Sequence, residues 1–148
     1  MTEAHAITLM RTHLESLFPK TCPNCQHHFA SLRDFFANAR PVGTPISYDL
    51  EDGDVKPVRP VGAVALSNCL CGSTLALTSE GMPLLKLWSV LLWARGETRR
   101  RGLTNQELMQ HLRVQMRLQV LAEPDLQPAN ETPEGKGMLP SMLVLNLV

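Results

Sequence analysis

Four cysteines, arranged as two close pairs, constrain the fold of this 148-residue chain more than any other feature. Cys22 and Cys25 form a Cys-x-x-Cys pair, Cys69 and Cys71 form a Cys-x-Cys pair, and 43 residues separate the two pairs. A short turn can direct two thiolates at one cation, and two such turns supply the four ligands of a tetrahedral metal site. Metal binding would also offset the entropy lost when distant segments are joined. The pattern predicts a four-cysteine site, with zinc as the favoured ion.

The sequence around the cysteines predicts short elements that would present them. Apolar residues recur at helical spacing in residues 3–18, and again from Ser31 to about Arg40. Residues 61–67 and 73–78 have the composition of strands, so the second pair would sit at the tip of a β-hairpin. Ile46–Leu50 is interpreted as a further short strand.

The two turns, Cys22-Pro23-Asn24-Cys25 and Cys69-Leu70-Cys71-Gly72, resemble the knuckles of zinc ribbons and rubredoxin-like modules. The resemblance covers roughly Thr21 to Thr78. It implies two knuckles on short antiparallel strands around one zinc ion, with Cys22, Cys25, Cys69 and Cys71 as ligands. Four thiolates close the coordination shell, whereas hydrolysis at zinc needs an open position. A structural zinc ion is therefore expected.

Other interpretations of the cysteines stay open. A Cys-Pro-x-Cys turn before a helix is also a redox motif, although no βαβ pattern surrounds Cys22. A shell of four thiolates can hold iron, and four buried thiols need not hold any ion. His27 and His28 could replace a cysteine as ligands, but polar residues that flank the turn are the simpler interpretation.

Residues 81–122 predict a helical hairpin. The helical pattern of the first helix begins at Met82 and extends to about Arg95 or Arg99, and a Thr-x-x-Glu capping box at Thr104 opens the second. A two-helix hairpin usually cannot bury both apolar sides internally, so we expect self-association, as in a dimer, or a protein partner. The alternative is that these sides belong to the core, with Trp88 and Trp93 packed against the ribbon or the N-terminal helix. A polar linker and an apolar tail, Met138–Val148, follow; the tail is either a last core strand or a docking segment.

These segments predict a small α+β protein. Residues 1–80 would hold the N-terminal helix and the zinc-ribbon-like module, 81–122 the helical hairpin, and 123–148 the linker and the apolar C-terminal tail. The chain carries no net charge, which gives no overall attraction to nucleic acid.

Charge is nevertheless segregated, because residues 81–117 carry a net +5 and the flanking blocks are acidic. Five arginines of this block are candidates for binding DNA phosphates or a partner: Arg99, Arg100, Arg101, Arg113 and Arg117. The first three also suit the C-terminal end of a helix, where they would complement its dipole. We favour this role, or a protein partner, over DNA.

Other signals narrow the class of protein. The longest apolar run, Leu84–Ala94, is interrupted by Lys86 and is too short to span a bilayer, and the N-terminus lacks a secretory pattern. We therefore expect a soluble, cytoplasmic protein with reduced thiols. No phosphate loop or nucleophile elbow is found, so an enzyme is not expected. The sequence favours a non-enzymatic zinc-binding regulatory or interaction protein. The alternatives are a DNA-binding transcription regulator and an iron or redox protein.

Overall fold

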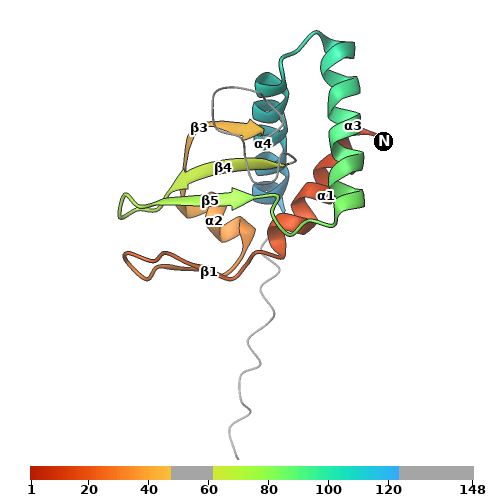
Figure 1. Ribbon diagram of the computed structural model, residues 1–148. Coiled ribbons are helices and arrows are strands. Elements are labelled where there is room, and N and C mark those ends of the chain that lie inside the picture. Colours follow the sequence, from red (N-terminus) through yellow and green to blue (C-terminus); the bar gives the residue numbers. More distant parts are fainter. Residues whose placement is uncertain (48–61, 124–148) are drawn as a thin grey trace, which may run out of the picture.

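The computed structural model describes residues 1–47 and 62–123 (Figure 1). These residues form helices and two small antiparallel sheets, which confirms the expected α+β class. The elements, in chain order, are α1 (Glu3–Glu15), β1 (Lys20–Thr21), β2 (His28–Phe29), α2 (Leu32–Asn38), β3 (Arg40–Ser47), β4 (Ala63–Asn68), β5 (Thr74–Thr78), α3 (Leu84–Arg101) and α4 (Asn105–Ala122). The expected apolar tail at 138–148 lies outside the described residues.

Two hairpins present the cysteine pairs. β1 and β2 form a two-stranded sheet in which Lys20 pairs with Phe29. β3, β4 and β5 form a three-stranded sheet with β4 in the centre, and the last pair of β4 and β5 joins Asn68 to Thr74. The second cysteine pair therefore lies in the turn of a β-hairpin, as its sequence predicted.

The third strand differs from its sequence prediction. The expected strand at 46–50 in fact begins at Arg40, and residues 48–50 lie outside the described part. Pro41 and Pro45 argued against a strand there, because proline cannot donate a ladder hydrogen bond. β3 tolerates them because it is an edge strand whose register shifts between Val42 and Ile46. Gly43, with φ of +58°, lies within this irregularity.

The helix starts follow the local sequence. Thr2, Ser31 and Thr104 each accept a hydrogen bond from a backbone N–H of the first turn of α1, α2 and α4, and Thr104 forms the complete capping box with Glu107. α3 continues through Gly96 to Arg101, slightly beyond the expected end at about Arg95 or Arg99, and its C-cap is Gly102 in the left-handed conformation with φ of +66°. A tolerated mid-helix glycine costs only about 1 kcal/mol, which neighbouring turns offset.

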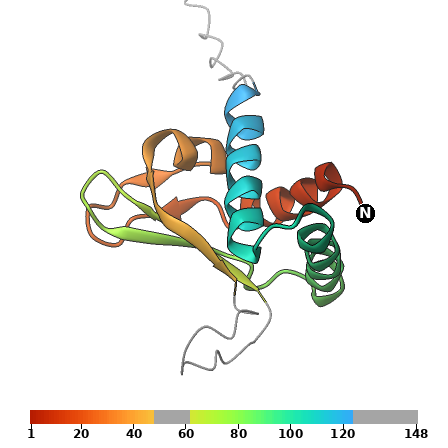
Figure 2. The ribbon, with the colours of Figure 1, turned by 90° about the horizontal axis from the view of Figure 1, so that it is seen from above.

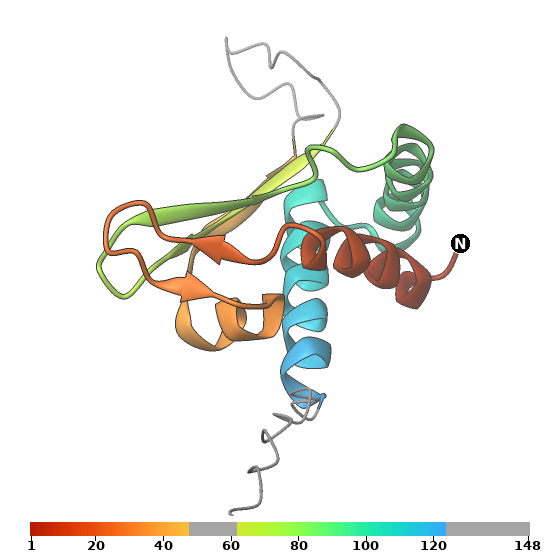
Figure 3. The same cartoon turned by 90° about the horizontal axis from the view of Figure 1, so that it is seen from below.

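Helix α4 organises the core. It crosses one face of the three-stranded sheet and contacts β3, α2, α1 and α3 (Figures 2 and 3). The knuckle-bearing hairpins extend to one side of α4, and α1 and α3 lie on the other (Figure 3). A single apolar cluster joins these parts and includes Ile7, Phe29, Phe35, Leu77, Leu108, Leu112 and Met116 as well as Cys22 and Cys69.

Candidate metal centre

The first knuckle is the turn between β1 and β2. The Cys22 N–H donates to the carbonyl of His27 over 2.9 Å, and the N–H of Gln26 donates back to the Cys22 carbonyl over 3.0 Å. Gln26 closes the turn with φ of +60°, a left-handed conformation that is uncommon outside glycine. These bonds bring Cys22 and Cys25 to the same side of the turn.

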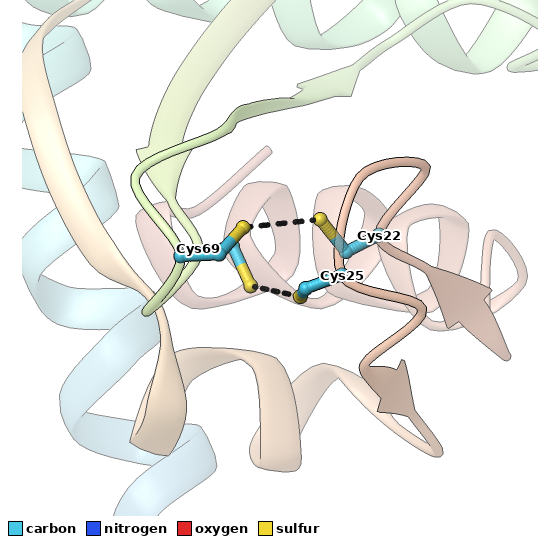
Figure 4. A group of neighbouring side chains, drawn as sticks. Cys22, Cys25 and Cys69 are labelled. Carbon is cyan, nitrogen blue, oxygen red and sulfur yellow. Dashed lines mark hydrogen bonds between the residues drawn. The ribbon is translucent and has the colours of Figure 1, made fainter.

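The second knuckle is the turn between β4 and β5. The Cys69 N–H donates to the Ser73 carbonyl, and the N–H of Gly72 donates to the Cys69 carbonyl, both over 2.8 Å. Gly72 has φ of +90°, which side chains disfavour, so glycine fits the position that follows Cys71. Figure 4 shows Cys22 and Cys25 pointing toward the turn that carries Cys69.

The four sulfur atoms meet between the two knuckles. Cys22 Sγ lies 3.7 Å from Cys71 Sγ, and Cys25 Sγ lies 3.6 Å from Cys69 Sγ. All four atoms lie within 4.8 Å of one another. In a regular tetrahedron with metal–sulfur bonds of about 2.3 Å, the sulfurs are about 3.8 Å apart. The four cysteines therefore fit the donor set and the spacing of a four-thiolate metal ion.

Burial differs within each pair. Cys22 and Cys69 are buried in the core cluster, at 0% and 3% exposure, while Cys25 and Cys71 face solvent. All four are free thiols. Each knuckle thus fixes one sulfur in the core and leaves the other at the surface, where an ion has access from solvent.

Hydrogen bonds in the turns give the thiols unequal pKa values. The backbone N–H groups of Cys25 and Asn24 favour the thiolate of Cys22 and lower its pKa. The hydroxyl and then the N–H of Ser73 lower the pKa of Cys71 to about 5. Donors directed at sulfur stabilise the thiolate, which is the form that binds a metal.

Cys25 behaves in the opposite way. The N–H of His27 lowers its pKa, but the neighbouring thiol of Cys71, burial and Cys69 together outweigh that effect and raise the pKa to about 12. Several thiols that share so small a volume cannot all be charged without a cation between them. A divalent ion between the sulfur atoms would offset the repulsion among the thiolates.

The neighbouring histidines have other contacts. The His27 ring packs edge-on against Phe29, with centroids 4.5 Å apart, and His28 Nδ1 lies 3.3 Å from the hydroxyl of Thr21. Within residues 1–47 and 62–123, the cysteines form the group of metal-ligand type, and neither histidine is part of it. These contacts agree with the interpretation that both histidines flank the turn and are not metal ligands.

The five candidate arginines do not share one environment. Arg113 donates to the carbonyls of Gly43 and Leu66, each over 2.8 Å, and so ties α4 to β3 and β4. Burial lowers the pKa of Arg113. The guanidinium of Arg117 lies over the Phe36 ring, 5.8 Å from its centroid. Contacts within the fold thus account for both α4 arginines.

Of the three arginines at the end of α3, two have ion pairs within the fold and one is exposed. Arg100 and Arg101 both bind the buried carboxylate of Glu97, and Arg101 also binds Glu3 of α1. Arg99 is exposed and has no ion pair among the described residues. Sequence reasoning missed this network, although the pairs of Glu97 with Arg100 and Arg101 have the i,i+3 and i,i+4 spacing of contacts within one helix. The contact of Arg101 with Glu3 depends on where α1 packs, which the α3 sequence does not encode.

The described residues also line an apolar cavity of about 100 Å³ between α1, the sheet and α4. Its walls include Met10, Leu77 and Met116. His13 and Arg113 also line it, and both of these polar groups contact backbone carbonyls, His13 that of Thr78 over 3.2 Å.

Comparisons with family models, curated proteins and solved structures found nothing that matches this chain. No helix within the described ranges has the length and apolar character needed to cross a bilayer.

Proposed function

We propose that this chain is a zinc-binding protein without catalytic activity, in which zinc holds Cys22, Cys25, Cys69 and Cys71. The observation that carries the proposal is the convergence of four sulfur atoms from two knuckles within 4.8 Å. Bound zinc would join the β1–β2 hairpin to the β4–β5 hairpin and so stabilise one end of the core.

The sulfur contacts favour a shared ion over a redox role for the first pair. Sulfur contacts of 3.7 Å and 3.6 Å run between the knuckles, from Cys22 to Cys71 and from Cys25 to Cys69. A Cys-x-x-Cys redox centre would leave the second knuckle without a role. Iron could occupy the same shell, but zinc is the usual ion of closed four-thiolate sites that have a structural role.

We further propose that the protein acts through contacts with another protein or with a second copy. Large apolar side chains remain exposed on both C-terminal helices, among them Leu85 and Trp88 of α3 and Leu118 of α4. DNA binding has less support, because Arg113 and Arg117 make contacts inside the fold. The protein would have a regulatory role if bound zinc decides whether the β1–β2 and β4–β5 hairpins are held together.

Elemental analysis of the purified full chain tests the metal proposal. We expect one zinc per chain in the wild type, and loss of zinc in Cys69→Ser. Leu70→Ser is the matched control, because Leu70 lies between the two cysteines, is 72% exposed and is not part of the sulfur group. A content of one iron per chain would identify the bound ion as iron instead of zinc. A wild type without metal, or a Cys69→Ser protein with full zinc content, would refute the proposal.

A further inference from the structure

The outward side of α3 carries a stripe that is apolar in its N-terminal part and basic in its C-terminal part. We call it the α3 stripe, and it consists of Leu84, Leu85, Trp88, Leu92, Arg95 and Arg99. These residues share one side because the α-helix repeats every 3.6 residues. The four apolar side chains are 69%, 85%, 48% and 53% exposed, in that order.

The described part of the protein leaves this stripe uncovered. α3 contacts α1 and α4 through its other side, where Val90 and Glu97 are buried (Figure 1). Arg95 and Arg99 are exposed and have no ion pair among the described residues, in contrast to Arg100 and Arg101. An exposed row of leucine and tryptophan marks a contact surface.

The sequence that follows α4 has the complementary pattern in reverse order. Asp125, Glu131 and Glu134 come first, accompanied by the single cation Lys136. The apolar run Met138–Val148 comes next and contains no charged residue. An antiparallel alignment therefore sets acidic residues against Arg99 and Arg95, and apolar residues against Leu92, Trp88 and Leu84.

We propose that residues 131–148 dock on the α3 stripe of the same molecule in this antiparallel sense, with Asp125 left in the linker. Arg99 lies close to the turn before α4, so it is about one 18-residue helix, about 27 Å, from Glu123. The eight residues from Pro124 to Glu131 can span up to about 29 Å when extended.

A second copy of α3 fits the stripe less well. Parallel pairing would bring the arginines of one copy against those of the other, and antiparallel pairing would set Arg99 against the apolar side chain of Leu84. α3 carries five cationic residues and one acidic residue, so two copies repel each other. The proposal concerns a different surface from the cysteines and does not depend on which metal they hold.

Acrylamide quenching of Trp88 fluorescence tests the proposal in the full chain. Trp93→Phe leaves Trp88 as the single tryptophan, and Trp93 is only a partly buried neighbour of the core. In this background we compare the parent with Leu143→Asp/Leu145→Asp, which places charge in the apolar run. Leu118→Asp on α4 is the matched control, since Leu118 is 59% exposed and lies off the stripe.

We expect the quenching constant to rise at least about twofold in the tail variant, because contact with the tail shields Trp88. The control should equal the parent, and the parent value should not change with protein concentration. Arg95→Glu/Arg99→Glu should also raise quenching, and Glu131→Arg/Glu134→Arg in the same chain should reverse that rise.

Three results would overturn the proposal. The first is equal quenching of the parent and the tail variant. The second is shielding that grows with protein concentration together with a dimer mass in sedimentation, which assigns the stripe to another copy. The third is shielding that arises only after vesicles of phosphatidylserine are added, which assigns it to an anionic lipid surface.

Discussion

Replacing Arg113 by methionine should destabilise the fold, because this side chain joins α4 to the sheet. Its guanidinium donates two hydrogen bonds of 2.8 Å, to the Gly43 carbonyl at the surface and to the partly buried Leu66 carbonyl. A hydrogen bond from a charged donor contributes about 1.5–3 kcal/mol when buried and less when exposed, so the expected loss is about 2–3 kcal/mol. Methionine keeps the apolar stem, which isolates the contribution of the guanidinium.

Urea unfolding at a fixed zinc concentration, followed by circular dichroism, measures this loss. With a slope of about 1.5 kcal/mol per molar urea, the midpoint should fall by about 1.3–2 M. Arg40→Met is the matched control, since Arg40 is exposed and has no ion pair among the described residues, and it should change stability by less than about 0.5 kcal/mol. If Arg113→Met were as stable as Arg40→Met, the role assigned to Arg113 would be wrong.

Three further predictions concern single residues. Arg100 first, and then Arg101, lower the pKa of Glu97 to about 2, so its contribution to stability is complete above its unfolded pKa near 4.5 and is lost as pH falls toward 2. The stability difference between wild type and Glu97→Gln should therefore shrink over that range in urea titrations, and a difference independent of pH would contradict this. Gly72→Ala should weaken metal binding in a competition titration with a chelator, because Gly72 has a positive φ that alanine disfavours. Gly96→Ala inside α3 should instead stabilise the fold by about 1 kcal/mol. Equal metal affinities of the two variants would refute the argument for Gly72. Thr104→Ala should cost about 1 kcal/mol through loss of the capping box, and an unchanged unfolding midpoint would count against it.

The sequence predicted those features of the fold that depend on residues close together in the chain. The capping box at Thr104, and the β-hairpin that carries Cys69 and Cys71, depend on neighbouring residues and agree with the structure. The convergence of the four cysteines was also predictable, because a shared ion is the simplest use of two close pairs.

Features that depend on distant contacts were not predictable. β3 begins at Arg40, with two prolines, because it occupies an edge of the sheet, and a single sequence does not identify the edge. Arg113 and Arg117, two of the candidates for binding DNA or a partner, lie on a side of α4 that faces the sheet and α2. The sequence could not show this, because it does not reveal that α4 packs across the sheet as well as against α3.

X-ray absorption at the zinc edge tests the central claim most directly, because it reports which atoms bind the ion. The account predicts four sulfur ligands at about 2.3 Å for zinc in the full chain, with no scattering from an imidazole ring. A shell of two sulfurs, or one that includes the nitrogen of His27 or His28, would contradict a site shared by both knuckles.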